Sequence, residues 1–147
     1  MGSQEYQHLR NEQARPLIEK IKKENPDTKV LVTFFSPSGY EIRKNDTLPD
    51  YIFYLPADTK RNARRFLDIV KPQSAIFIKY EFWFNYIHEL SSRNIPFYYV
   101  SAIFRPTQYF FKPIGKWFVR QLSHASGFFV QNEESKKLLN SVAIQQV

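Results

Sequence analysis

Short apolar segments alternate with segments of helical spacing along the chain. The apolar segments hold five to seven residues rich in β-branched and aromatic side chains, as is typical of strands. They cover residues 29–35, 51–55, 74–79, 95–101 and 127–131. Between them, apolar residues recur every three or four positions, which predicts helices. We expect these helices over residues 16–24, 59–70, 82–93, 106–122 and 133–139, with a further short one that ends near Asn45.

The expected strands are apolar on both faces, as in Ala75-Ile-Phe-Ile78. Strands of this kind that alternate with helices form a parallel sheet covered by helices on both sides. The predicted fold class is therefore α/β. Ligands of open parallel sheets bind at the carboxyl ends of the strands. Here those ends carry residues 36–39, 56–58, 79–81, 101–105 and 131–134.

Length, charge and cysteine content limit the class of protein. A chain of 147 residues suits one domain. The absence of cysteine excludes disulfides and thiolate metal sites, and the three histidines are too scattered to suggest a zinc cluster. The net charge of +7 favours partners that carry phosphate. No run reaches the roughly 18 to 20 apolar residues that span a bilayer, so we expect the chain as given to be soluble.

Two strand ends carry candidate chemistry. Ser36-Pro-Ser-Gly39 resembles a phosphate-binding turn, because amides at the start of a helix favour anions; the alternative is a plain cap and turn. Glu81 follows an apolar strand and precedes Phe82-Trp83. Partial desolvation would suit this carboxylate to proton transfer or to holding a hydroxyl. The alternative is that Glu81 caps the following helix.

Basic and aromatic residues occur together in the second half of the chain. Aromatic residues make up 17% of the sequence, too many for every ring to be buried, which predicts an exposed apolar patch. Lys112, Lys116 and Arg120 recur every four residues beside Trp117. This combination suits an anionic membrane surface, and the alternative is a solvated charged face over core rings. A second basic set consists of Arg61, Arg64 and Arg65.

Several motifs follow one another in the order found in a known family. They are Val32-Thr-Phe-Phe-Ser-Pro-Ser-Gly-Tyr-Glu41, Tyr54-Leu-Pro-Ala-Asp58, Arg65-Phe66, Lys71-Pro72, Tyr80-Glu-Phe-Trp-Phe-Asn85, Ser101-Ala-Ile-Phe-Arg105 and Val130-Gln-Asn-Glu-Glu134. Over residues 12–147 the sequence thus resembles the N-terminal half of 3-deoxy-D-manno-octulosonic acid (Kdo) transferase, a bacterial enzyme of lipopolysaccharide assembly.

The resemblance implies a glycosyltransferase of the GT-B type with two Rossmann-like domains. In that family the C-terminal domain holds the donor CMP-Kdo, and the N-terminal domain faces the lipid A precursor at the cytoplasmic side of the inner membrane. Transfer inverts the anomeric centre and needs no metal at the catalytic step, so neither a metal nor a cofactor is expected. Membrane contact becomes the favoured interpretation of Lys112, Lys116, Trp117 and Arg120.

The resemblance also carries over a few roles. Glu81 matches the second carboxylate of the family and is the candidate catalytic residue. The acceptor-side turn and the cleft are matched by Ser36, Ser38, Gly39, Arg105 and Asn132. When residues 12–18 are aligned with the helix that follows the general-base glutamate of the family, Arg10 takes the place of that glutamate. The hydrophobic anchor, the first strand and the donor domain have no counterpart in the sequence, so we expect a fragment that is inactive alone.

The resemblance predicts two segments. Residues 1–11 are expected to be a polar segment that is non-native or disordered, and residues 12–147 to form one Rossmann-like domain. The missing first strand would be central in such a sheet. Its loss leaves unpaired edges or makes strand 29–35 pair with strand 74–79, and self-association through a sheet edge is expected.

Two other functions stay open. One is a non-catalytic module that binds nucleic acid through basic charge and exposed rings. The other is a different GT-B sugar-nucleotide transferase. Helices on both faces of the sheet would leave no stacking platform for bases, so we do not expect nucleic acid as a partner. The ordered set of motifs makes a different transferase the weaker alternative.

Overall fold

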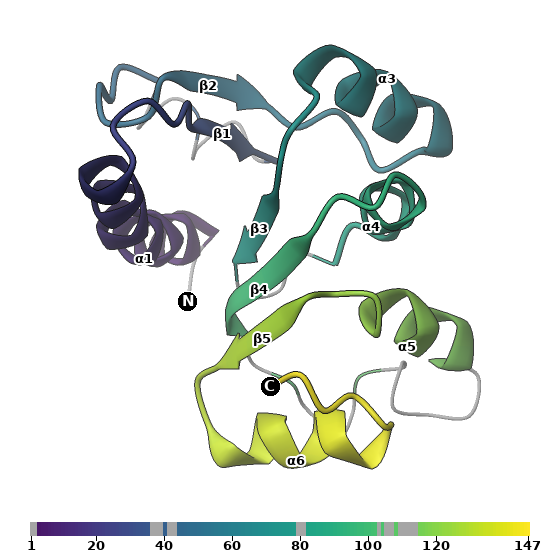
Figure 1. The fold of residues 1–147 in the computed structure, drawn as a ribbon. Coiled ribbons are helices and arrows are strands. Elements are labelled where there is room, and N and C mark those ends of the chain that lie inside the picture. The colour runs from purple at the N-terminus through teal and green to yellow at the C-terminus, as the bar shows by residue number, and fades with distance from the viewer. Residues whose placement is uncertain are drawn as a thin grey trace. The chain divides into compact units, whose positions relative to one another are not determined.

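The computed structural model describes residues 3–35, 40, 44–78, 82–102, 104, 108 and 115–147, with the backbone alone for residues 3–13 and 101. The chain forms two compact units, Met1–Ala57 and Asp58–Val147. Each unit combines parallel strands with helices, so the predicted α/β class is confirmed (Figure 1). The predicted limits of a segment 1–11 and a single domain 12–147 stay predictions.

The first unit consists of a long helix and a two-stranded parallel sheet. Its elements are α1 (Ser3–Glu24), β1 (Leu31–Phe34) and β2 (Tyr51–Tyr54). Asp50 ties the helix to the sheet, because its Oδ2 accepts from Lys22 Nζ at 2.7 Å and from the Val30 amide at 2.8 Å. The hydrogen bond from Lys22, followed by that from Val30, lowers the pKa of Asp50 below 3.8. The residues just before β1 and β2 are thereby fixed to each other and to α1.

Helix α1 begins at Ser3, so the predicted start at Pro16 is wrong. The residues ahead of Pro16 are mostly polar and form no apolar stripe, so periodicity gives no signal there. They are nevertheless rich in glutamate, glutamine and arginine, which favour helix by intrinsic propensity. Pro16 lies inside the helix and removes one backbone hydrogen bond without ending it.

The second unit alternates helices and strands. Its elements are α3 (Lys60–Val70), β3 (Ala75–Ile78), α4 (Phe84–Ser92), β4 (Phe97–Ala102), α5 (Lys116–Leu122), β5 (Gly127–Val130) and α6 (Glu133–Ser141). The three strands form one parallel sheet in the order β3-β4-β5. Within the predicted helical region 106–122, the structure describes Gln108 and residues 115–122.

Four of the five described strands lie at an edge of their sheet. Only β4 pairs with a strand on each side, whereas β1, β2, β3 and β5 each pair with one strand. Strand edges without a strand partner, one of the two predicted outcomes, are therefore present within each unit. Direct pairing of strand 29–35 with strand 74–79 stays a prediction. An unpaired edge offers backbone hydrogen-bonding groups to another strand. Self-association through such an edge stays a prediction.

A ladder of stacked rings crosses the three-stranded sheet. Phe77, Tyr99 and Phe128 lie opposite one another in register, with ring centroids 5.3 Å apart at both steps. All three side chains are buried. Phe82 and Phe104 add ring contacts to Tyr99 at 5.5 Å and to Phe128 at 5.9 Å. Because aromatic rings bury large apolar areas, this ladder is the centre of the core.

The opposite face of this sheet is more open. Phe129 keeps 62% of its surface exposed and Ile76 keeps 39%. The predicted cover of helices on both faces is therefore incomplete among the described residues. The exposed apolar surface that the aromatic content predicts is also present, although the rings of Phe84, Phe97, Tyr99, Phe104 and Phe128 are buried in the core.

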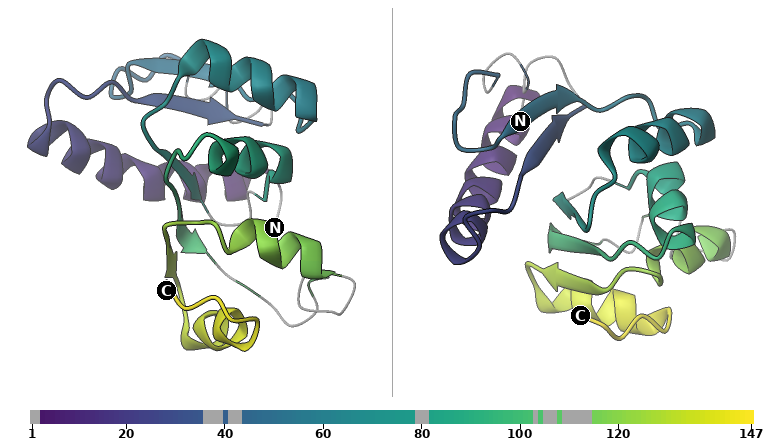
Figure 2. Two further views of the ribbon diagram at one scale, coloured as in Figure 1. Left: turned by 45° about the vertical axis from the view of Figure 1, so that its right-hand side comes forward. Right: turned by 45° about the horizontal axis from the view of Figure 1, so that its top comes forward.

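Helices α3, α4 and α5 lie side by side along the sheet (Figure 1, Figure 2). Aromatic contacts join each helix to the next. Phe66 of α3 meets Tyr86 of α4 edge to face at 5.7 Å, and Phe84 of α4 meets Phe118 of α5 at 4.6 Å. These contacts fix the starts of α4 and α5 relative to each other, and the middle of α3 to the start of α4.

The ladder predicts which rings the fold requires. Phe128→Ala removes a buried ring that stacks on Tyr99, and we expect it to lower the free energy of unfolding by about 3–5 kcal/mol. Phe129→Ala, on the open side of the same strand, is the matched control and should change it by about 0.5 kcal/mol at most. Urea unfolding followed by circular dichroism measures both, with Phe128→Leu as a smaller deletion. Equal losses for the two alanine variants would show that the ladder is not the core.

Candidate functional site

Four of the site residues predicted from the sequence lie in the described part of the chain. Asn132 follows β5, and Lys116, Trp117 and Arg120 belong to α5. The predicted residues that lie outside the described ones are Ser36, Ser38, Gly39, Glu81, Arg105 and Lys112. Of Arg10, the structure gives only its place in α1.

Asn132 caps helix α6 at the carboxyl edge of the sheet. Its Oδ1 accepts from the Ser135 amide at 2.8 Å, and its backbone is extended, as is usual for a cap. Ser135 is fully buried, and its hydroxyl accepts from the Phe104 amide at 2.8 Å. Ser135 therefore links Phe104, which follows β4, to α6. Nothing in the sequence indicates this role. The role of Asn132 in acceptor binding stays a prediction.

Asp58 connects the start of α3 to the start of α4. Its Oδ1 accepts from the backbone amides of Asn85 at 3.1 Å and Tyr86 at 3.3 Å, while Asn85 Nδ2 donates to the Asp58 carbonyl at 2.8 Å. The next residue, Thr59, caps α3, because its Oγ1 accepts from the Asn62 amide at 3.1 Å. One carboxylate and one side-chain amide therefore hold two helix starts together. We call these contacts the Asp58 clamp.

The Asp58 clamp perturbs two protonation equilibria. Burial raises the pKa of Asp58 above 3.8, and the hydrogen bonds from Asn85 and Tyr86 oppose this shift by favouring the charged form. Burial, reinforced by the charge of Asp58, raises the pKa of Tyr86 to about 12. The Tyr86 phenol therefore stays protonated at neutral pH. Its ring, which is almost fully buried, serves the packing of α3 on α4.

A second polar network joins α3 to α4. Glu89 exposes only 10% of its side chain, and it accepts from Arg64 Nε at 3.0 Å and from Arg93 Nε at 3.4 Å. The nearly buried carboxylate is thus neutralised by two guanidinium groups, which such a position requires. Arg64 is therefore committed to the fold. Arg61 and Arg65 of the same basic set are exposed and have no acidic partner among the described residues.

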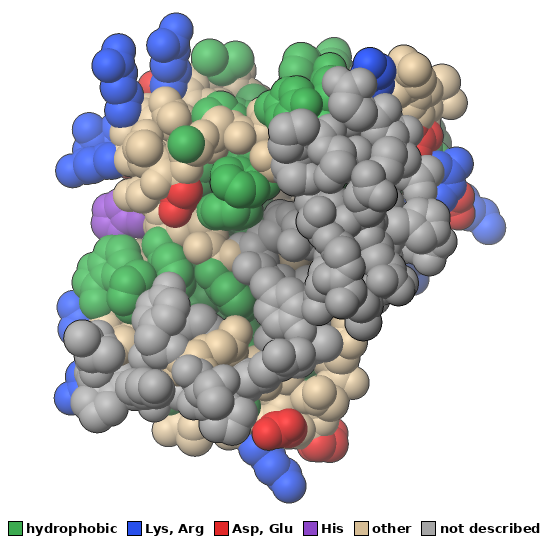
Figure 3. All heavy atoms as spheres, turned by 180° about the vertical axis from the view of Figure 1, so that it is seen from behind, with side chains coloured by type: hydrophobic (Ala, Val, Ile, Leu, Met, Phe, Trp, Pro, Cys, Tyr) green, Lys and Arg blue, Asp and Glu red, His purple; other side chains and the backbone are tan. Residues whose placement is uncertain are grey.

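Helix α5 presents an exposed indole between two cations. Trp117 is 49% exposed, and its ring meets Phe118 edge to face at 4.9 Å and Phe84 at 6.0 Å. Lys116 and Arg120 are exposed one turn apart, on the same side of the helix, without an acidic partner in the described part of the chain. Figure 3 shows cationic side chains and a histidine next to a hydrophobic patch on one face.

Trp117 also lines a cavity at the starts of α3, α4 and α5. The cavity has a volume of about 200 Å³, and its other walls come from Lys60, Asn85, His88 and Glu89. In open parallel sheets, the helix starts that follow the strands lie on the ligand side of the fold. Of these five residues, only Trp117 is predicted as a site residue from the sequence, although Asn85 ends one of the motifs of the resemblance. The available signal for Lys60 and Asn85 was their position at helix starts after predicted strands.

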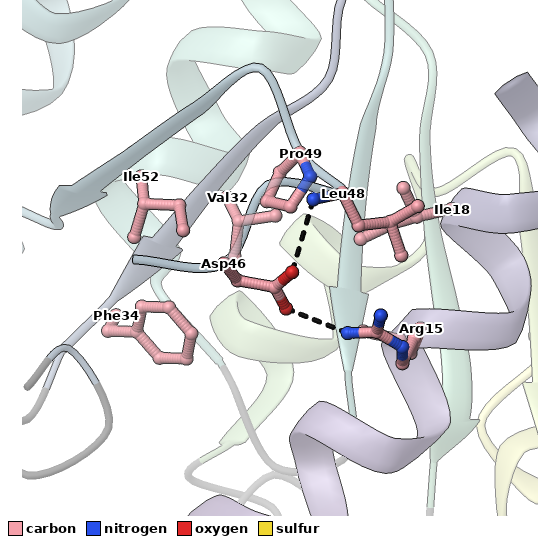
Figure 4. A pocket seen from close by; sticks show the side chains of 9 residues that line it. Arg15, Ile18, Val32, Phe34, Asp46, Leu48, Pro49 and Ile52 are labelled. Atoms are coloured by element: carbon pink, nitrogen blue, oxygen red, sulfur yellow. Dashed lines mark hydrogen bonds and ion pairs between the residues drawn. The ribbon is translucent and has the colours of Figure 1, made fainter. Parts of the chain in front are cut away.

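A smaller cavity lies in the first unit, between α1 and the two strands (Figure 4). Its volume is about 30 Å³, enough for a water molecule or two but not for a sugar. Ile18, Val32 and Ile52 form part of its apolar wall, and the ion pair of Arg15 with Asp46, at 2.9 Å, closes one side. We regard this cavity as a packing feature rather than a binding site.

Within the residues that the structure describes, no group of three acidic, histidine or cysteine side chains could hold a metal ion. No helix in the same part of the chain combines the length and the hydropathy needed to cross a membrane. Helix α1 has 22 residues but is polar.

Comparisons with known proteins agree with the resemblance found in the motifs. The family model described as 3-Deoxy-D-manno-octulosonic-acid transferase (kdotransferase) matches residues 11–147. The chain is 37% identical over 91 residues to the 3-deoxy-D-manno-octulosonic acid transferase of Haemophilus influenzae, covering 60% of the chain and 21% of the relative. It is 32% identical over 69 residues to the protein of the same name from Aquifex aeolicus, covering 46% and 19%. The chain thus spans about a fifth of the length of these relatives.

The Asp58 clamp predicts a loss of stability on substitution. Asp58→Ala leaves two amides without their acceptor, and we expect it to lower the free energy of unfolding by about 1–3 kcal/mol. Asp58→Asn keeps an acceptor oxygen and should lose less. Urea unfolding of both variants measures the difference. Equal losses would mean that the acceptor oxygen is not what stabilises the two helix starts.

The raised pKa of Asp58 also predicts a pH dependence. The folded chain binds this proton more tightly than the unfolded chain, so the stability contributed by Asp58 falls as pH rises through the raised pKa and is regained as pH falls towards 3.8. The unfolding free energy of the native chain should therefore increase, relative to that of Asp58→Asn, between neutral and mildly acidic pH. Parallel pH profiles for the two proteins would contradict the assignment.

Proposed function

Because the chain belongs to the 3-deoxy-D-manno-octulosonic acid (Kdo) transferase family of glycosyltransferases, we propose that it is the acceptor-side part of a GT-B enzyme. The enzyme would transfer Kdo from CMP-Kdo to the lipid A precursor during lipopolysaccharide biosynthesis. Its place would be the cytoplasmic face of the bacterial inner membrane, where this part of the chain meets the acceptor. Neither a metal nor a cofactor is part of the proposal.

The observation that supports this role best is the surface of α5. A phosphorylated, acylated acceptor requires cations for its phosphates and a route out of the bilayer. Trp117 offers a half-exposed indole, and Lys116 and Arg120 flank it with charges that no described acid neutralises. Indole rings settle at the level of the lipid headgroups, and each cation near an anionic surface contributes about 1 kcal/mol. Lys112, four residues before Lys116 in the sequence, is proposed as a further phosphate contact.

The reacting part of the site is proposed from the family resemblance. Glu81 would act on the acceptor, either by binding it or by taking part in proton transfer. The acceptor turn and the cleft would be formed by Ser36, Ser38, Gly39, Arg105 and Asn132. The 147-residue chain aligns with about a fifth of the length of its relatives. The resemblance would also put Arg10 where the family has its general base. We therefore propose that this chain by itself binds the acceptor without completing the transfer.

Vesicle binding tests the membrane role of α5. The chain is mixed with vesicles that contain the tetraacylated lipid A precursor, with plain anionic vesicles of equal charge density and with single-stranded DNA, over a range of salt concentrations. Lys116→Glu should weaken binding to both kinds of vesicle by about tenfold, because it reverses a charge that faces the headgroups. Lys137→Glu makes the same change on α6 and should leave binding unchanged.

Glu81→Gln tests the acceptor role in the same assay. We expect this variant to lose the preference for lipid A precursor over plain anionic vesicles, because the carboxylate that would hold an acceptor hydroxyl is gone. Its binding to plain vesicles and its salt dependence should not change. Equal binding to both vesicles and to single-stranded DNA, abolished by salt and indifferent to Glu81, would favour a nucleic-acid-binding module instead.

A further inference from the structure

Helix α5 depends on its neighbours for its orientation. It has seven residues, and its N-cap, Gly115, makes no side-chain hydrogen bond. Helices of this length are marginal in water by themselves, so contacts with other elements must hold α5 in place. Leu122 is fully buried, and the ring of Phe118 lies 4.6 Å from that of Phe84 in α4. Such apolar contacts favour burial without being directional, and they define the rotation of α5 about its axis only weakly.

Two side-chain hydrogen bonds join α4 to the last turn of α5 and add direction. His88 Nδ1 lies 3.3 Å from Gln121 Oε1, an oxygen that can only accept, so His88 is the donor. One turn further along α4, Ser91 Oγ lies 2.9 Å from Nδ1 of His124, which follows α5. Hydrogen bonds require a defined distance and angle, so this pair restricts the rotation that the apolar contacts leave open.

Gln121 is the buried member of these contacts. It is only 5% exposed, whereas His88, its partner, is exposed. A leucine at this position would bury apolar surface without needing a hydrogen bond, so a glutamine is not required for stability. In helix pairs, a single buried polar contact can fix the alignment of the helices at some cost in stability. Gln121 is suited to this kind of role.

The alignment of α5 determines where its exposed side chains point. Trp117 lies four residues before Gln121 and therefore on the same side of the helix. Lys116 and Arg120 each precede one of these two residues. Because an α-helix turns by about 100° per residue, a rotation that separates Gln121 from His88 also turns the indole and both cations. It would move Trp117 away from the Phe84 ring, which now lies 6.0 Å from it.

From these contacts we propose that Gln121, held by His88, is a positioning residue for the membrane contact of α5. It fixes the rotation in which the indole and the two cations of α5 face an anionic lipid surface together, and it does not itself touch the lipid. This inference rests on the proposed function and deepens it, because it names the contact that sets the geometry of the binding surface.

NMR of the 147-residue chain tests the positioning without a membrane. The indole signals of Trp117 are identified by their loss in Trp117→Phe. In the native chain we expect nuclear Overhauser contacts between this indole and the Phe84 ring, and in Gln121→Leu we expect them to be lost. The urea midpoint of Gln121→Leu should be equal to or higher than that of the native chain, because leucine buries apolar surface and the exposed His88 can bind water instead.

Vesicles made of equal parts of phosphatidylglycerol and phosphatidylcholine test the consequence. Gln121→Leu should bind them about fivefold more weakly, the loss expected when one cation no longer reaches the surface. His88→Leu should do the same. His88→Asn places an amide donor near the position of Nδ1, and it should restore both the affinity and the indole contacts.

Ser92→Ala is the matched control. It removes a hydrogen bond of 2.9 Å from the Ser92 hydroxyl to the His88 carbonyl, which lies within α4 and does not reach α5. We expect it to change neither the indole contacts nor the affinity for vesicles.

Three results would overturn the proposal. One is a Gln121→Leu chain with native indole contacts. Another is equal loss in His88→Asn and His88→Leu. The third is weaker vesicle binding that accompanies a lower urea midpoint, since this would give Gln121 a structural role only. If the native chain does not bind these vesicles at all, the proposed membrane role of α5 is wrong, and the indole contacts still decide whether Gln121 positions Trp117.

Discussion

The Asp58 carboxylate is the contact that joins the starts of α3 and α4 in the second unit. It accepts from two amides of α4 while the next residue, Thr59, caps α3, so a single turn of chain positions both helices. Burying the charge is unfavourable, as the raised pKa of Asp58 shows, and the amide donors offset that cost. The shape of the cavity beside Trp117 depends on this arrangement, because two of its lining residues, Lys60 and Asn85, belong to the two helix starts that Asp58 holds.

Behind the helices, the aromatic ladder explains how so many rings fit into a small unit. Parallel strands in register place Phe77, Tyr99 and Phe128 in one row, and neighbouring rings in this row stack on each other. The ring contacts then continue outward to α4 and α5 through Phe84. The half-exposed Trp117 is the outer end of this continuous packing. The position of the Trp117 ring therefore depends on the core residue Phe84 as well as on its neighbour Phe118 in α5.

The sequence predicts the local features of this structure better than the long-range ones. Runs such as Ala75-Ile-Phe-Ile78 carry their signal within a few residues, and the strand there was predicted correctly. Helix α1 was predicted too short because the residues before Pro16 have propensity but no periodicity. The contact of Asp58 with Asn85 spans 27 residues and that of His88 with Gln121 spans 33, and neither leaves a local pattern. The cavity could not be derived because it is made of such contacts.

The cations of the chain divide into those paired with acids in the fold and those that are exposed without such a partner. The second group is the one that makes the net charge of +7 available to anionic partners. One group is built into the fold: Lys22 holds Asp50, and Arg64 with Arg93 neutralises Glu89. The other group is exposed without an acid among the described residues, and it includes lysines of α1 and α6 as well as Lys60, Arg61, Arg65, Lys116 and Arg120. The last five belong to α3 and α5, the two helices on either side of α4. Since screening leaves isolated surface charges little effect on stability, charges grouped in this way contribute to the attraction of anions rather than to the fold.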